Sequence, residues 1–183
     1  REDKALIEIT APSKDKGNKT LKIGDEMWNY LKNTETTMKI PPSMMMRSWN
    51  GSDLTNDDIV RESDLVEDYK TTIMFEEKIG GEMCWKLELI PKSSAAVVWG
   101  KIYYWVRKSD YLPALIQYYE EKGRLIRTMK FRGYEMMDSR KIPTKWIVES
   151  NTKENHYTVF TYEDVEFNVD IPDRIFSFRQ LER

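Results

Sequence analysis

The residues that usually carry catalysis or bind metals are scarce in this sequence. His156 is the only histidine and Cys84 the only cysteine, so the sites that need two or three imidazoles or paired thiolates cannot be built. The sequence has no G-x-S-x-G turn to expose a serine nucleophile, no glycine-rich phosphate loop and no dinucleotide fingerprint. Adjacent acids such as Glu76 and Glu77 point to opposite faces of a strand and cannot share a substrate. We therefore predict that the protein is not an enzyme and uses no metal ion and no cofactor.

Soft apolar side chains are what the sequence has in excess. It contains ten Met, six Trp, ten Tyr and six Phe. Methionine adapts to irregular space, and aromatic rings offer a large contact area with few rotatable bonds. Most of these residues are expected in the core. Met44, Met45 and Met46 are different, because three successive side chains on an irregular segment cannot all point into one packed interior.

Met44, Met45 and Met46 lie in Pro41–Asp68, the one long stretch without strand alternation. Two prolines begin this stretch, and Thr55 with Asp58 matches a capping box that predicts a short helix near Thr55–Glu62. The acidic residues here lack the alternate spacing of a calcium loop, which favours capping over metal binding. We interpret the stretch as a movable cover over the apolar face of a sheet.

The composition limits the classes of protein to which this chain can belong. A chain of 183 residues with 40% hydrophobic residues is the size of one domain, and we predict a single domain over residues 1–183. The 29 basic and 31 acidic residues are interspersed, which argues against a nucleic-acid partner. No apolar run approaches the roughly 18 to 20 residues that cross a bilayer. The sequence opens at Arg1 without an initiator Met or a signal peptide, as a processed or trimmed chain would.

Most of the remaining sequence alternates between apolar and polar residues. This pattern predicts about ten short antiparallel strands, typical of a barrel or a curved sheet. We expect strands at Lys4–Thr10, Lys19–Ile23, Glu26–Lys32, Thr36–Ile40, Thr71–Glu76, Met83–Leu89, Lys101–Lys108, Pro113–Glu120, Arg124–Arg132, Ile142–Ser150 and within His156–Val169, with a helical turn in Asp173–Leu181.

Three of these segments carry more specific information. Met83, Trp85, Leu87 and Leu89 share one face of a strand. Both faces of Lys101–Lys108 are apolar, so this strand is covered on both sides or borders a cavity. The face of Arg124–Arg132 that holds Leu125, Met129 and Phe131 also holds Arg127, and Gly133 then predicts a bulge or bend.

The run TLKIGDEMWNYLKNTETTMKIPPSMMMRSWNGSDLTNDDIV, from Thr20 to Val60, resembles the signature segment of the outer-membrane lipoprotein-sorting proteins of the LolA-like superfamily. The matching elements are a "lk.gdemW.Y" strand pair, a "ki.ps" step and an "s..GSD.t..D" stretch. The later segments GKIYYWV, YLPALIQYYEEKGRLIRTMKF and IPTKWIVES are similar to the central hairpins and the late strand of that family.

The resemblance implies a half-open antiparallel β-barrel with a short helical lid, which holds acyl chains of a lipoprotein in the periplasm. It also implies an N-terminal helix and further strands that precede Arg1, so the chain is expected to be truncated relative to the family. The partners expected from the family are lipoprotein acyl chains or lipid, an inner-membrane exporter and an outer-membrane receptor. The alternative is a sensing module of the same fold that detects lipid or misfolded envelope protein.

The predicted ligand-binding residues fall into two groups. The first group lies in the cover and comprises Met44, Met45, Met46 and Trp49. The second group lies on the sheet and comprises Phe75, Trp85, Leu87, Leu89, Tyr104, Met129, Phe131 and Trp146.

Overall fold

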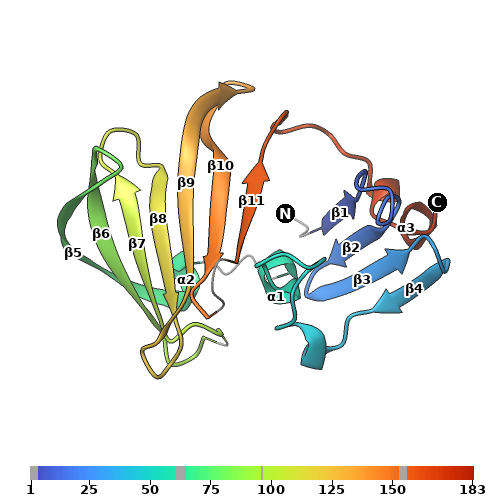
Figure 1. Ribbon diagram of the computed structural model, residues 1–183, viewed down its shortest axis with the longest axis horizontal. Helices are drawn as coiled ribbons and strands as arrows, with labels where there is room; N and C mark the ends of the chain where they lie inside the picture. Colours follow the sequence, from blue (N-terminus) through green and yellow to red (C-terminus); the bar gives the residue numbers. More distant parts are fainter. Residues whose placement is uncertain (1–3, 61–64, 96, 153–155) are drawn as a thin grey trace. The chain divides into compact units, whose positions relative to one another are not determined.

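The structure is a computed structural model that describes residues 4–60, 65–95, 97–152 and 156–183. Its strands form two antiparallel sheets, and the chain divides into two compact units (Figure 1). The first unit comprises residues 1–62 and 168–183, and the second comprises residues 63–167. The chain therefore leaves the first unit, forms the whole of the second and returns to the first.

The first unit is built on a four-stranded sheet in the order β1-β2-β3-β4. Its strands are β1 (Lys4–Glu8), β2 (Lys19–Ile23), β3 (Glu26–Leu31) and β4 (Thr36–Lys39). One face carries Leu21 and Tyr30, which form a core cluster with the fully buried Leu181 of α3 (Phe178–Leu181). α3 follows η2 (Asp173–Ile175), so the end of the chain supplies one of the three buried residues of this core.

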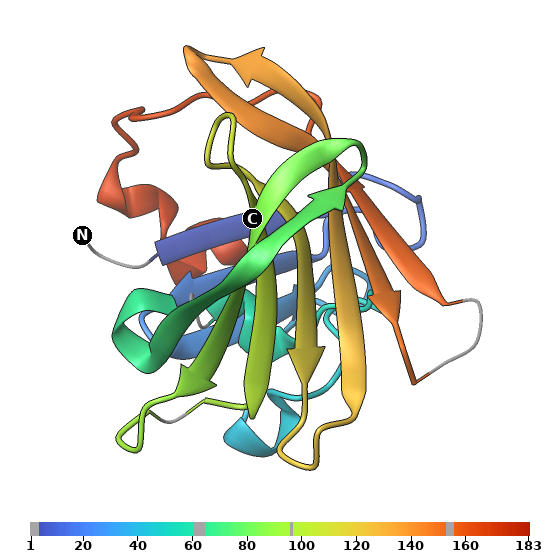
Figure 2. The same ribbon diagram turned by 90° about the vertical axis from the view of Figure 1, so that its left-hand side faces the viewer.

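The second unit is a seven-stranded antiparallel sheet in the order β11-β10-β9-β8-β7-β6-β5. Its strands are β5 (Tyr69–Ile79), β6 (Glu82–Pro91), β7 (Lys101–Arg107), β8 (Pro113–Tyr119), β9 (Leu125–Met137), β10 (Arg140–Ser150) and β11 (Tyr157–Thr161). Figure 2 shows these strands side by side, with the β9–β10 hairpin extending beyond its neighbours. β5 and β11 are the two edges of the sheet, which is therefore not closed. This confirms the predicted mainly β, half-open architecture.

Among the described residues, three further short helical segments lie between β4 and β5 in the sequence. η1 (Pro42–Met44) and α1 (Asn56–Val60) belong to the first unit, and α2 (Leu65–Asp68) leads directly into β5 in the second. Thr55 and Asp58 form the predicted capping box: the Asp58 backbone N–H donates to Thr55 Oγ1 at 3.2 Å, and the Thr55 backbone N–H donates to Asp58 Oδ2 at 2.7 Å. The last residues of the predicted helix, 61 and 62, lie outside the described residues.

Two of the hairpins turn on a pair of consecutive residues with positive φ. Gly80 and Gly81 have φ of 60° and 91° between β5 and β6, a conformation that suits two glycines in a hairpin turn. Asp138 and Ser139 have φ of 40° and 66° between β9 and β10, where no turn was expected. The expected strands Arg124–Arg132 and Ile142–Ser150 are therefore too short, because this turn lets both strands continue.

Gly133 lies within β9, at the point where the sequence predicted a bulge or bend. Its φ is 63°, and a Cβ at this position would lie 2.5 Å from Thr144 Oγ1. Thr144 Oγ1 donates a hydrogen bond to the Gly133 carbonyl at 2.7 Å and so bridges the distortion. The strand bends here without ending. The expectation of a single domain stays a prediction.

Candidate functional site

One face of the seven-stranded sheet is apolar, and we call it the apolar face. Residues that pair across antiparallel strands share a face. A central row runs through Leu87, Tyr104, Ile116, Met129 and Val148, across five strands. Two residues along the strands, Trp85 pairs with Val106, and Phe131 pairs with Trp146 on the same face. In the other direction lies the row Leu89, Ile102, Tyr118, Arg127 and Ser150.

Aromatic pairs continue this face toward both of its ends. Phe131 and Trp146 contact edge to face, with ring centroids 5.3 Å apart, and Tyr162 packs against the other side of Trp146 at 5.5 Å. Trp85 stacks on Tyr111 at 5.6 Å, and Trp99 lies 5.0 Å from Tyr118. The rings therefore present a broad surface of low side-chain entropy.

Tyr69 lies at one end of the apolar face. It pairs with Pro91, two residues beyond Leu89 along β6. Burial, together with the charges of Asp68 and Tyr118, raises the pKa of the Tyr69 hydroxyl to about 12.

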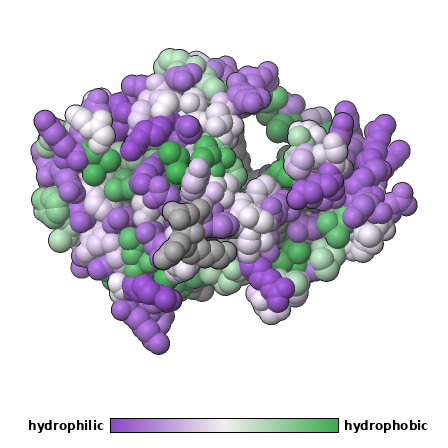
Figure 3. Space-filling view, in the orientation of Figure 1, coloured by the Kyte–Doolittle hydropathy of each residue, from purple (hydrophilic) through white to green (hydrophobic). Residues whose placement is uncertain are grey.

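We call the opposite face of this sheet the charged face. Its side chains contact one another through cation–π contacts and hydrogen bonds. The Lys86 ammonium lies over the rings of Phe75, Tyr103 and Trp105 at 5.1, 4.3 and 4.7 Å. Trp105 Nε1 donates to Glu77 at 2.8 Å, and Lys130 bonds Glu149 at 2.6 Å. Figure 3 shows hydrophobic residues interspersed among hydrophilic ones on the surface that this unit presents in that view.

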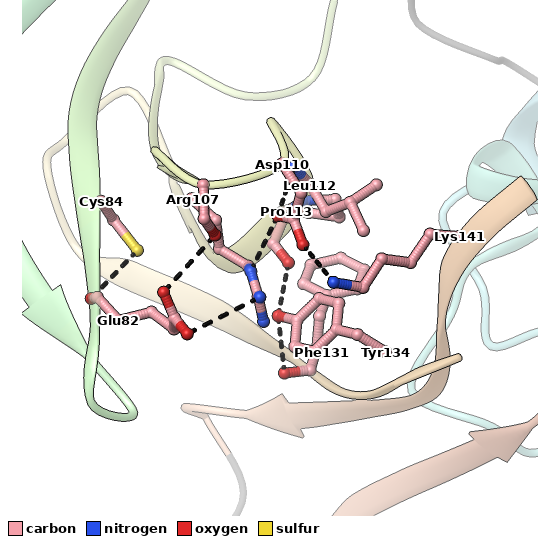
Figure 4. A network of polar contacts seen from close by, with 10 residues as sticks. Glu82, Cys84, Arg107, Asp110, Leu112, Pro113, Phe131, Tyr134 and Lys141 are labelled. Carbon is pink, nitrogen blue, oxygen red and sulfur yellow. Dashed lines mark hydrogen bonds and ion pairs between the residues drawn. The ribbon is translucent and has the colours of Figure 1, made fainter. Parts of the chain in front are cut away.

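A polar network fixes the β7–β8 turn (Figure 4). Arg107 Nε donates to Asp110 Oδ1 at 2.9 Å, Lys141 donates to Asp110 Oδ2 at 2.8 Å, and the Arg107 guanidinium lies 3.8 Å from the centroid of the Tyr134 ring. Burial alone would raise the pKa of Asp110, but the hydrogen bonds from Lys141 and the Leu112 backbone, with the charge of Arg107, lower it below its usual range. The turn carries Tyr111, whose φ is 59° and whose ring covers Trp85.

The predicted cover is a hydrogen-bonded structure in the first unit. Trp49 is buried and its Nε1 donates to Thr20 Oγ1 at 3.3 Å, which ties the segment to β2. The Asn56 amide donates to the Met44 carbonyl at 3.0 Å, and the Asp57 N–H donates to the Met45 carbonyl at 2.9 Å. Met44 and Met45 are half-buried and Met46 is 49% exposed. The three methionines do not all point into one interior, as the sequence indicated.

Comparisons with known proteins agree on the type of fold. A family model described as "uncharacterized protein" matches residues 1–183. A DUF1329 family protein from Desulfovibrio piger is 29% identical, with a TM-score of 0.89 over 99% of this chain and 78% of that one. A domain from Vibrio parahaemolyticus, described as an outer membrane lipoprotein-sorting protein domain, is 22% identical, with a TM-score of 0.83 over 100% of this chain and 78% of that one. A LolA superfamily protein from Nitrosomonas europaea is 24% identical, with a TM-score of 0.76 over 97% and 78%. Among curated proteins no match was found.

The chain belongs to the family of the model that matches residues 1–183. Its fold is LolA-like. The resemblance that the signature segment carries is thereby confirmed for the fold.

The LolA-like sheet brings together most of the residues predicted to bind a ligand. Trp85, Leu87, Leu89, Tyr104, Met129, Phe131 and Trp146 share the apolar face. Phe75 does not share it. A bulge between Ile73 and Phe75 shifts the register, so Phe75 pairs with Lys86 on the charged face. Phe75 therefore lies on the face opposite the other seven, and its role in binding stays a prediction. Alternation along one strand does not reveal an extra residue.

Several residues of the apolar face escaped the sequence analysis. Ile116 and Val148 complete the central row through their pairing with Met129. Tyr69 precedes the expected strand Thr71–Glu76, but it is 2% exposed and pairs with Pro91 on this face. Cross-strand neighbours, which one strand alone does not show, would have been needed to find them.

Two further findings concern the described residues alone. They contain no group of three or more His, Cys, Asp or Glu that could hold a metal ion. Within the same ranges, none of the helices has the length and apolar character that a membrane crossing requires.

Proposed function

We propose that this LolA-like protein is a periplasmic carrier that binds acyl chains of lipoproteins or lipids on the apolar face of its seven-stranded sheet. The observation that carries the proposal is the continuity of that face. Apolar and aromatic residues occupy the central row from β6 to β10, whereas the charged face at the same strands is crossed by Lys86, Lys130 and Glu149.

The energetics suit a carrier with little chemical selectivity. Each methylene removed from water stabilises the complex by about 0.8 kcal/mol, so part of an acyl chain is enough for useful affinity. Methionine and aromatic side chains adapt to chains of different shape without a fixed hydrogen-bond pattern. Met129, Phe131 and Trp146 supply such a surface on adjacent strands.

The relatives support the direction of transport that we propose. The Vibrio parahaemolyticus domain is named for outer membrane lipoprotein sorting, and its fold is that of this chain. In our proposal the protein receives its cargo from an inner-membrane exporter and delivers it to an outer-membrane receptor. Met44, Met45, Met46 and Trp49, which belong to the first unit, stay predicted ligand contacts.

Quenching by a brominated fatty acid tests which face binds. A bromine atom quenches tryptophan fluorescence on contact, and the delipidated protein has Trp85 and Trp146 on the apolar face but Trp105 on the charged face. We expect saturable quenching that decreases in Trp85→Phe and Trp146→Phe and is retained in the matched Trp105→Phe variant. Absence of quenching and of any extractable lipid would refute the carrier function. Loss of quenching in Trp105→Phe alone would place the ligand on the charged face and refute binding on the apolar face.

A further inference from the structure

Arg127 is a cation within the apolar face. It pairs with Tyr118 on one side and with Ser150 on the other, in the row that also holds Leu89 and Ile102. The residue is only 4% exposed. Desolvating a guanidinium is costly, so its retention among these residues calls for compensating contacts.

Two aromatic rings hold the Arg127 guanidinium in place. It lies 4.6 Å from the Tyr118 ring centroid and 4.9 Å from that of Trp99. Such cation–π contacts are favourable, more so when they are desolvated. Because a guanidinium has five N–H donors, an anion can join the contacts that it makes within the protein.

A second polar group lies near the same end of the apolar face. The Tyr69 hydroxyl is buried and makes no hydrogen bond to any described residue. A tyrosine hydroxyl is protonated at neutral pH, so it is a donor. A buried donor without an acceptor is destabilising, and a ligand oxygen that accepts from it would remove this penalty. Tyr69 pairs with Pro91, two residues beyond Leu89, whose row holds Tyr118 and Arg127.

We propose that the ligand is amphipathic, and that its anionic head group, a carboxylate or a phosphate, binds at Arg127 while its chain lies along the apolar face toward Met129 and Phe131. This inference rests on the proposed function and adds the orientation of the ligand along the sheet. The head group binds at the end of the sheet that holds Trp99, Tyr118 and Tyr69. The chain runs along the strands toward Trp146 and Trp85.

Three ligands with the same chain test the head group. Dodecanoate, dodecyl phosphate and dodecanol are titrated into the delipidated full chain at pH 8, with tryptophan fluorescence as the readout. We expect the two anions to bind at least about tenfold more tightly than the alcohol, since hydrogen bonds and ion pairs to a charged group are stronger than those to a neutral hydroxyl. The ratio of the two anions shows whether the natural head group is a free fatty acid or a phosphate ester.

Matched variants assign the preference to Arg127. Arg127→Gln should abolish the preference for anions and leave the affinity for dodecanol within about threefold. Arg124 lies three residues before Arg127, and its exposed guanidinium bonds Glu120. The control variant Arg124→Gln should keep the preference for anions. Tyr69→Phe should weaken the anions alone by about threefold, and it decides the case if Arg127→Gln does not fold.

The outcomes separate this inference from the proposed function. If none of the three ligands binds, the carrier function fails. If dodecanol binds as tightly as the anions, or if Arg127→Gln and Tyr69→Phe keep the full preference, the carrier function stands and the anion site is refuted.

Discussion

Cys84 shows how burial decides the chemistry of a reactive residue type. Its thiol is fully buried, and its Sγ donates to the Glu82 carbonyl at 3.6 Å. Burial raises the pKa of the thiol, which outweighs the opposite effect of the nearby Arg107. Since the thiolate is the reactive form, the folded protein should react with a disulfide reagent far more slowly than the protein in urea. Release of the chromophore at pH 8 measures this, and equal rates in the two states would contradict it.

At the residue scale the sequence identified the types of side chain correctly but not all of their neighbours. The sequence placed Arg127 on one face with Leu125, Met129 and Phe131. It did not show that the guanidinium contacts Trp99 and Tyr118, which come from a loop and another strand. The face of Phe75 depends on a bulge that is defined only by its partner strand. Both cases need the pairing register.

Asp110 links a single titration to the stability of the β7–β8 turn. Its carboxylate bonds both Arg107 and Lys141, and its pKa in the folded state is lower than in the unfolded chain. A lowered pKa contributes stability that is present above the unfolded value of about 4 and is lost as the pH falls through the folded value. Asp110→Asn should therefore destabilise the protein by about 1 to 3 kcal/mol at pH 7, and by progressively less below about pH 4.

Urea unfolding of wild type and Asp110→Asn between pH 2.5 and 7 measures this difference. Asp25→Asn, in the exposed turn between β2 and β3, is the matched control and should change stability little at any pH. A constant difference between wild type and Asp110→Asn across the range would show that the carboxylate charge is not what fixes the turn.

The capping box gives a similar test for α1. Thr55 Oγ1 accepts from the Asp58 N–H and donates to the Asp58 carboxylate at 2.8 Å. Thr55→Ala removes both bonds and should cost about 1 kcal/mol of local stability, seen as faster hydrogen exchange in residues 56–60. Thr34→Ala, in the exposed turn before β4, serves as control. Unchanged exchange in α1 would show that the backbone bonds of the segment suffice without the cap.

Turns and caps were the elements that the sequence predicted best, because their signals are local. Thr55 with Asp58 and Gly80 with Gly81 each act within a few residues. The turn at Asp138 and Ser139 was missed because neither residue is glycine and Gly133 nearby offered a stronger signal.

At the scale of the whole molecule, alternation predicted the mainly β class, whereas the division into two sheets required contacts between distant residues. The clearest of these contacts is the return of the chain end to the first sheet. Leu181 is fully buried with Leu21 and Tyr30, about 150 residues earlier in the chain. No local pattern indicates which sheet α3 joins.

The same contact tests whether the chain unfolds as one domain. Leu181→Ala removes a fully buried side chain from the first unit and should destabilise it by about 2 to 5 kcal/mol. Cys84 reports on the second unit, since its thiol becomes reactive only when that sheet opens. If the 183 residues form a single domain, Leu181→Ala lowers the urea midpoint of thiol exposure together with the midpoint from far-UV circular dichroism.

Leu31→Ala, at a 39% exposed position in the same sheet, is the control and should move neither midpoint by much. If Leu181→Ala instead splits the dichroism into two transitions and leaves the thiol midpoint unchanged, the two units unfold separately. Ligand binding would then be tested on residues 63–167 alone, because the apolar face lies entirely within them.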